Sequence, residues 1–134
     1  IEALRAAEAM EKFHGVSLEV IDPRTIAPLD YEMIYESVNK TKCCIIADND
    51  WLNCGFSAEV AARISEVCFG TLQKPVSRLG FSDTPCPTTR PLENKFYPNA
   101  VNIIRLAESK LNLKPVDLSD EEFYSYENKF KGPF

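Results

Sequence analysis

The chain has 134 residues and a mass of 15.1 kDa, which is enough for one domain with a real core and too little for two ordinary domains. Its residues are 45% hydrophobic and 26% charged, the balance of a soluble globular protein, and no apolar run approaches the roughly 18 to 20 residues of a transmembrane helix. The net charge of −5 and the pI near 4.9 have the wrong sign for nonspecific binding to nucleic acid or to an anionic membrane. We therefore expect neither among its partners.

The acidity is concentrated near the C-terminus. From Asp117 to Phe134 there are five acidic residues and two lysines, a net charge of −3. Ser119 and Glu122 have the spacing of a capping box for a short helical turn. We expect a domain over residues 1–115 and an acidic, aromatic tail over residues 116–134 that docks on another surface, with disorder as the alternative. The aromatic residues of the tail are Phe123, Tyr124, Tyr126, Phe130 and Phe134.

The first half of the chain alternates between helical and strand patterns. Residues 2–14 carry apolar side chains at helical spacing and end before a glycine suited to the C-terminal cap. Residues 16–21 alternate between apolar and polar side chains, as a strand does. Asp30 is a good N-cap for a second helix that ends near Lys40. Residues 43–47 form a short apolar run, which predicts a strand buried on both faces.

The alternation continues beyond this strand. A polar loop over residues 48–55 leads into a third predicted helix, which starts at a capping Ser57 and closes at Gly70. Another short strand is predicted at residues 75–80.

The last part of the chain completes the pattern. Residues 81–98 are rich in proline and are predicted as an extended loop, and Asn99 caps a last helix that runs to about Leu111. Elements in this order predict an α/β fold with three α/β/α layers and a mostly parallel sheet. Three strands are few for a sheet covered on both faces, and no strand precedes the first helix. We therefore expect a sheet that lacks one or more N-terminal strands.

Few residues of the chain suit catalysis. His14 is the single histidine and would be the base of any serine–histidine–acid arrangement, but its place at a helix end next to Gly15 favours an exposed, helix-terminal role. Asp48, Asp50 and Asn53 follow a predicted strand, at the edge where parallel sheets place their ligands. A cation site there is one reading, and a solvated loop or a charge complement to a helix N-terminus is the favoured one. We expect no catalytic, cofactor-binding or metal-binding residue in this chain.

The five cysteines have irregular spacings without a C-x-x-C pair, so no zinc site is expected. We interpret them as reduced thiols that act as small hydrophobic residues in an intracellular protein. They are Cys43, Cys44, Cys54, Cys68 and Cys86.

Four segments of the chain, taken in order, form a recognisable set. They are Gly15 to Asp30 (GVSLEVIDPRTIAPLD), Ser37 to Thr41 (SVNKT), Gly55 to Ala61 (GFSAEVA), and Asp83 to Pro87 (DTPCP) with Leu92 and Glu93. Their order and spacing resemble the C-terminal domain of transketolase-like proteins. The likeness is closer to the beta subunit of thiamine-diphosphate-dependent 2-oxo acid dehydrogenases of the pyruvate, branched-chain and acetoin types, and it covers roughly residues 2–111.

The resemblance implies a domain that assembles and docks and is not itself catalytic. In that family the thiamine diphosphate and its magnesium lie between the alpha subunit and the N-terminal domain of the beta subunit, outside the part that this chain matches. The C-terminal domain is a three-layer α/β/α unit that helps to build the assembly of two alpha and two beta subunits. It also receives the acyltransferase core of the complex. The implied compartment is a bacterial cytoplasm or a mitochondrial or plastid matrix.

Structural roles are expected for the matched residues. Arg24 braces a carbonyl or a carboxylate at a strand end, and Pro28 with Asp30 sets the turn before the second helix. Gly55 permits a close backbone approach, and Glu59 complements the dipole of the third helix.

The chain departs from the family pattern in three places. The strands that precede the first helix are absent, Gln73 stands where the family often has an acidic residue that holds the basic binding domain of the acyltransferase, and the tail runs past the usual family end. Two other functions stay open: the C-terminal domain of a transketolase or deoxyxylulose-phosphate synthase, and a free-standing protein-binding module.

Overall fold

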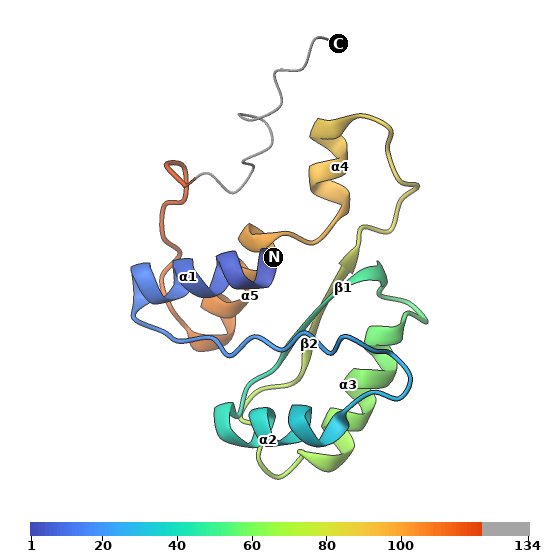
Figure 1. Ribbon diagram of the computed structural model, residues 1–134. Coiled ribbons are helices and arrows are strands. Elements are labelled where there is room, and N and C mark those ends of the chain that lie inside the picture. The colour runs from blue at the N-terminus through green and yellow to red at the C-terminus, as the bar shows by residue number, and fades with distance from the viewer. Residues whose placement is uncertain (122–134) are drawn as a thin grey trace.

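A computed structural model describes residues 1–121 and shows a small parallel sheet between two layers of helices (Figure 1). The predicted turn at Ser119 and Glu122 and the five aromatic residues of the tail lie wholly or partly outside the described residues. Within them, no helix is both long and apolar enough to cross a membrane. The elements are α1 (Glu2–His14), α2 (Tyr31–Thr41), β1 (Ile45–Trp51), α3 (Phe56–Val67), β2 (Ser77–Phe81), α4 (Arg90–Phe96) and α5 (Ala100–Leu111).

The two strands carry the layered architecture. β1 and β2 pair in parallel, with Ile45 opposite Ser77 and Ala47 opposite Leu79. Because successive side chains of a strand point to opposite faces, Ile45 packs against the core of α1 and α5, and Ile46 packs against the core of α2 and α3. Figure 1 shows these helix pairs on opposite sides of the sheet. The predicted α/β fold is confirmed.

Each face of the sheet has its own core. Between α1 and α5, small alanines allow the helices to approach closely, and Met10 and Ile104 fill the space between them at 0% and 1% exposure. Between α2 and α3 the buried residues are Ile34, Val38, Val60, Ile64 and Cys68. β1 and the segment at residues 16–21 contribute side chains to both cores.

The strand predicted at residues 16–21 is wrong as a strand, although its pattern is right. Val16 and Leu18 pack against the core of α1 and α5, and Ile21 packs against the other core. The segment belongs to no ladder because no strand lies beside it. A strand is defined by its hydrogen-bonded neighbour, which a single-segment pattern cannot reveal.

Other boundaries also differ from the prediction. β1 begins at Ile45 rather than Cys43 and continues through Asp48, Asn49 and Asp50, which were predicted as loop. Its last residues extend to the carboxyl end of the sheet, past a register shift, where alternate side chains reach solvent and polar residues are tolerated. β2 is likewise shifted toward the C-terminus, to Ser77–Phe81.

Two helix predictions need correction. Ser57 does not cap α3, because the helix starts one residue earlier, with Gly55 at the N-cap. α3 also ends at Val67, before Gly70. Within the predicted loop at residues 81–98, α4 forms over Arg90–Phe96, with a proline in its first turn. Proline is compatible with that position because the first N–H groups of a helix have no intrahelical acceptor.

The predicted caps of the other helices are confirmed. The side chain of Asp30 accepts a hydrogen bond from the backbone N–H of Met33 at 3.1 Å. Asn99 and Asn102 bond reciprocally at the start of α5, each bond 3.1 Å long. Gly15 ends α1 in the left-handed conformation, with φ of 64°. These local signals are readable because cap chemistry involves residues close in sequence.

Gly55 lies where no side chain fits, so Gly55→Ala should destabilise the fold. A Cβ at this position would overlap the carbonyl oxygen of Trp51, which is backbone and cannot move aside alone. We expect a loss of about 1–3 kcal/mol in the free energy of unfolding, measured by denaturant titration. Gly70→Ala is the matched control because a Cβ there meets nothing within 4 Å. Equal losses in both variants would contradict the close approach.

Candidate functional site

The single histidine is held against a buried carboxylate. His14 was expected to be exposed, but its side chain is 10% exposed and Nε2 lies 3.0 Å from Oε1 of Glu108. Glu108 comes from α5 and is 1% exposed. It also accepts from Arg105 Nη1 at 2.8 Å and from the backbone N–H of Val116 at 3.0 Å. The expectation of exposure failed because the partner lies 94 residues away in sequence.

This cluster ties three segments of the chain together. Glu108 joins the end of α1 to α5, and Arg105 also donates to the carbonyl of Val116 at 2.9 Å. Burial by itself raises the pKa of Glu108, but the hydrogen bonds from His14, Arg105 and Val116 more than offset it and hold the pKa below its usual value. A buried carboxylate so fully bonded is a structural clamp.

Asp50, one of the acidic residues that follow the apolar part of β1, bonds to backbone N–H groups. The carboxylate of Asp50 accepts from the backbone N–H of Phe56 at 3.1 Å and from its own neighbour Trp51 at 2.7 Å. Asp50 therefore supplies the first turn of α3 with the acceptor that its N-cap glycine lacks, and the predicted helix-terminus role is confirmed for it. Asp48 and Asn53 form no such cap. Across residues 1–121, no three His, Cys, Asp or Glu side chains are grouped so that they could hold a metal ion.

The cysteines are free thiols, but they do not all act as core residues. Cys68 is buried, whereas Cys54 and Cys86 are exposed, contrary to the expectation for all five. Burial raises the pKa of Cys44 to about 11, so its thiol stays protonated and unreactive near neutral pH.

The matched loop residues make local contacts. Arg24 pairs with the carboxylate of Asp22 at 3.2 Å, on the surface. Glu59, in the first turn of α3, pairs with Arg63 one turn later at 2.7 Å. Thr25 donates its hydroxyl to the carbonyl of Pro28 at 2.9 Å, within the turn that precedes α2. These contacts are structural, and most are too exposed to add much stability.

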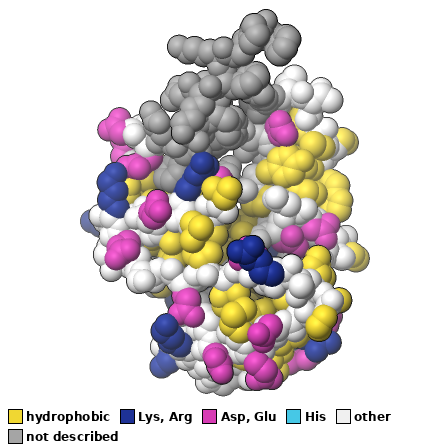
Figure 2. Space-filling model, in the orientation of Figure 1, with side chains coloured by type: hydrophobic (Ala, Val, Ile, Leu, Met, Phe, Trp, Pro, Cys, Tyr) yellow, Lys and Arg dark blue, Asp and Glu magenta, His cyan; other side chains and the backbone are white. Residues whose placement is uncertain are grey.

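Aromatic side chains gather at the carboxyl end of the sheet. The rings of Phe81 and Phe96 stack with centroids 4.7 Å apart, and Trp51 and Tyr97 pack edge-on against Phe81. Phe96 is buried, but Trp51 is 43% exposed. Figure 2 shows hydrophobic side chains near this end of the molecule and others across the middle of the same face. Parallel sheets bind ligands at this edge, and here the edge carries a group of aromatic rings.

A second exposed apolar region lies at the other end of α3. Phe69 is 83% exposed and Val67 is 59% exposed. Gln73 and Lys74 follow in the same turn and are also exposed, and the backbone N–H of Gln73 bonds to the carbonyl of Lys42 at 2.9 Å. We call these four residues the α3–β2 turn surface. Its large exposed ring has no structural role inside the domain.

Sequence reasoning missed the two buried charged residues of α5. Glu108 and Lys110 are 1% and 8% exposed, and Lys110 Nζ bonds to Ser77 Oγ at 2.9 Å. One signal was available for Glu108, because it follows Ile104 by four residues and so lies on the apolar stripe of the helix. Lys110 gives the same signal, because it follows Ile103 by seven residues and Ala107 by three. Its partners at the start of β2 depend on the tertiary fold.

The chain is similar to a known family and to named enzymes. The family described as "Transketolase, C-terminal domain" matches residues 1–103. The pyruvate dehydrogenase E1 component subunit beta of Staphylococcus epidermidis is 39% identical over 110 residues, which are 82% of this chain and 33% of that protein. The mitochondrial subunit of the same name from Ascaris suum is 35% identical over 113 residues, 84% of this chain and 31% of that protein.

A relative with a different named substrate matches equally well. The 3-methyl-2-oxobutanoate dehydrogenase subunit beta of Mycobacterium tuberculosis is 38% identical over 109 residues, which are 81% of this chain and 31% of that protein. The chain thus spans about a third of the length of these relatives.

Removing the charge of Glu108 should weaken the contact between the end of α1 and α5. Glu108→Gln keeps the shape but leaves Arg105 and His14 with a weaker acceptor, so we expect a loss of about 1–3 kcal/mol in the free energy of unfolding. Glu11→Gln is the control, since Glu11 is exposed on α1 and its change should stay within about 0.5 kcal/mol. Denaturant titration measures both. Equal losses of unfolding free energy in the two variants would mean that the hydrogen bonds of Glu108 do not stabilise the fold.

The same variant should alter the acid sensitivity of the fold. Because the pKa of Glu108 is lower in the folded chain, its stabilisation is fully present above the unfolded value of about 4.3 and is lost as the pH falls through the folded value. Between about pH 6 and pH 3 the native chain should therefore lose more unfolding free energy than Glu108→Gln does. Thermal unfolding at a series of pH values tests this, and parallel curves would contradict it.

Proposed function

Because the chain belongs to the transketolase C-terminal domain family, as its residues predicted, we propose that it is the non-catalytic assembly and docking domain of a 2-oxo acid dehydrogenase beta subunit. The whole enzyme would be an oxidoreductase that acts on pyruvate or on a branched-chain 2-oxo acid. The names of the relatives from three organisms support this reading over that of a transketolase.

The proposal rests on a contrast between two observations. The chain matches the family over most of its length, but its candidate catalytic side chains have structural contacts. The match extends over residues 1–103, yet the one histidine within it is bound to a buried carboxylate and Asp50 caps a helix. The match also spans only about a third of the relatives. A domain of this kind contributes surfaces to an enzyme whose reacting groups lie elsewhere.

The described residues do not fit thiamine diphosphate with magnesium. A magnesium ion that bridges a diphosphate needs oxygen ligands aimed at one point, and residues 1–121 contain no group of three such side chains. The carboxylate closest to that role, Asp50, already accepts two backbone N–H groups. We therefore propose that the cofactor of the whole enzyme binds outside this chain.

The two exposed apolar surfaces suit the two kinds of partner in such an enzyme. The aromatic residues at the carboxyl end of the sheet are Trp51, Phe81, Phe96 and Tyr97, and Trp51 is half exposed. This group suits packing against an alpha subunit or a second beta subunit, because aromatic residues are enriched in interface cores. The α3–β2 turn surface suits the acyltransferase core. With Gln73 in place of an acidic residue, an apolar contact through Phe69 would replace part of the charge attraction.

The division into residues 1–115 and 116–134 is kept as a proposal. The first residues after the boundary contact the body of the domain, since the carbonyl of Val116 accepts from Arg105 and the carboxylate of Glu121 pairs with Lys12. The compartment that we propose is a bacterial cytoplasm or a mitochondrial or plastid matrix, which are the settings of the family.

Replacing Phe69 should separate docking from catalysis. In the full-length beta subunit assembled with its alpha subunit, Phe69→Asp should weaken binding to the acyltransferase core by about tenfold or more, because a desolvated aromatic anchor is lost. Decarboxylation of the 2-oxo acid with an artificial electron acceptor should be unchanged. Since Phe69 is 83% exposed, the fold should tolerate the change.

Leu4→Asp is the control for this experiment, as the same change at a 56% exposed residue of the opposite layer. Core binding that falls equally in both variants, or in neither, would contradict docking through the α3–β2 turn surface. A 134-residue chain that is a stable monomer and binds no dehydrogenase component would contradict the proposed function as a whole.

A further inference from the structure

Lysine residues gather around the turn that leads from α3 to β2, although the chain as a whole carries a net charge of −5. Lys42 is the C-cap residue of α2, and its carbonyl accepts a hydrogen bond from the backbone N–H of Gln73 at 2.9 Å. Lys74 follows Gln73, and both lysines are exposed. The two basic side chains therefore start from backbone segments that are bonded to each other.

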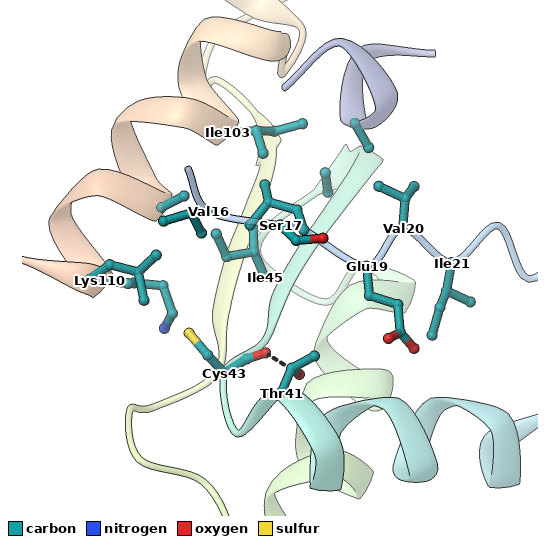
Figure 3. Close-up of a pocket in the computed structure, with 15 residues that line it drawn as sticks. Val16, Ser17, Glu19, Val20, Ile21, Thr41, Cys43, Ile45, Ile103 and Lys110 are labelled. Carbon is teal, nitrogen blue, oxygen red and sulfur yellow. Dashed lines mark hydrogen bonds between the residues drawn. The ribbon is translucent and has the colours of Figure 1, made fainter. Parts of the chain in front are cut away.

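A third cation lies next to the same turn. Nζ of Lys110 donates to the carbonyl of Pro75, the residue after Lys74. Figure 3 shows Lys110 directed toward Cys43, the residue after Lys42, at one end of a cavity that Lys110 and Cys43 both line. Because Lys110 is almost fully buried, water and salt screen its charge less than they screen an exposed charge.

The two exposed lysines are not neutralised within the described part of the chain. Among residues 1–121, Lys40 pairs with Glu19, whereas neither Lys42 nor Lys74 forms an ion pair with a carboxylate. The last turn of α3 carries one acidic residue, Glu66, which is exposed. Part of the positive charge complements the negative C-terminal ends of α2 and α3. The remainder is open to a partner.

A large apolar side chain belongs to the same surface. Phe69 is largely exposed, and Val67 is more than half exposed. Two backbone N–H groups of the turn donate to the carbonyl of Cys68, which keeps Phe69 close to Gln73 and Lys74. An aromatic ring of this kind is a typical anchor of a protein interface, and the charges around an anchor select its partner.

The charges at this surface favour an acidic occupant. Interfaces place positive groups of one protein against negative groups of the other, and like charges brought together are repelled. A basic segment would bring its cations against Lys42 and Lys74. An uncharged apolar segment would cover Phe69 but would remove water from the lysines without replacing it. A segment that carries carboxylates on either side of a large apolar residue satisfies both features.

We propose that the α3–β2 turn surface binds an acidic segment of a partner protein, with carboxylates beside Lys42 and Lys74 and a large apolar side chain against Phe69. This inference rests on the docking role proposed above for that surface, and it adds the charge of the segment that docks there. Gln73 stands where the family often has an acidic residue that holds a basic binding domain. The charge preference of this chain is therefore reversed.

Two fluorescent peptides test this charge preference. Both have central leucines, which are flanked by about three glutamates on each side in one peptide and by as many lysines in the other. Fluorescence anisotropy measures their binding to the full-length beta subunit assembled with its alpha subunit, at roughly 50 mM salt. Only binding that Phe69→Asp removes is counted, because other surfaces of the enzyme retain the rest. We expect the acidic peptide to bind about tenfold or more tightly than the basic one.

Charge reversal at one lysine shows whether this surface is responsible. Lys74→Glu should weaken binding of the acidic peptide by about tenfold, and Lys74→Arg should preserve it. Lys95→Glu is the control, because Lys95 is an exposed lysine of α4, which packs at the carboxyl end of the sheet through Phe96. Both glutamate variants change exposed side chains, so their melting temperatures should match that of the unchanged enzyme. Equal loss of binding in Lys74→Glu and Lys95→Glu would overturn the proposal.

The acyltransferase core, used in place of the peptides, gives this inference and the proposed function separate outcomes. Gln73→Glu should weaken core binding and Gln73→Lys should strengthen it, each by about threefold or more. If Phe69→Asp abolishes core binding but Gln73→Glu strengthens it, docking stands and the present proposal is overturned. If Phe69→Asp leaves core binding unchanged, docking of the core at this surface fails, and the peptide comparison decides the charge of the occupant.

Three further results would overturn the proposal. The first is equal binding of the two peptides or tighter binding of the basic one. The second is tighter binding, lost in Phe69→Asp, to phosphatidylserine vesicles than to the acidic peptide, since the occupant would then be a membrane surface. The third is self-association of the assembled enzyme that Lys74→Glu abolishes, since the occupant would then be a second copy.

Discussion

The pairing of backbone groups in the interior of the sheet is the constraint on which the rest of this structure depends. β1 lies between two helical layers, where water cannot replace a missing hydrogen-bond partner. Its edge toward β2 is satisfied, and a cavity of about 400 Å³ is lined by Ile45 and Ala47 of the same strand. One hydrophobic core lies on each face of the sheet.

Buried polar groups elsewhere show how strictly the fold meets this demand. Glu108 is as buried as Ser57, yet it accepts hydrogen bonds from three directions, and Lys110 donates to Ser77 at the start of β2. Against that background the unpartnered hydroxyl of Ser57 is an exception. Ser57 lines the cavity between β1 and the helices α2 and α3.

The fold could be predicted from sequence wherever the signal is local. Caps such as Asp30 and Asn99 and the alternation of helices with apolar runs require only near neighbours. The predictions that failed depend on residues far apart in the sequence. The segment at residues 16–21 has a strand's pattern but no partner strand. His14 was predicted to be exposed, but it packs against Glu108 of α5. α4 failed for a different reason, since proline was read as a helix breaker at the one position where it is compatible with a helix.

The candidate site follows the same division between local and non-local signals. The sequence alone indicated how few residues could do chemistry, because the single histidine and the lack of a C-x-x-C pair are visible without geometry. It could not show the α3–β2 turn surface, since exposure of Phe69 depends on how α3 ends and on what packs beside it. A large aromatic ring left in water is disfavoured unless another surface covers it. Polar side chains such as Asp50 and Glu108 make caps and internal hydrogen bonds. The exposed apolar side chains make no comparable contacts, and they are suited to contact with another protein.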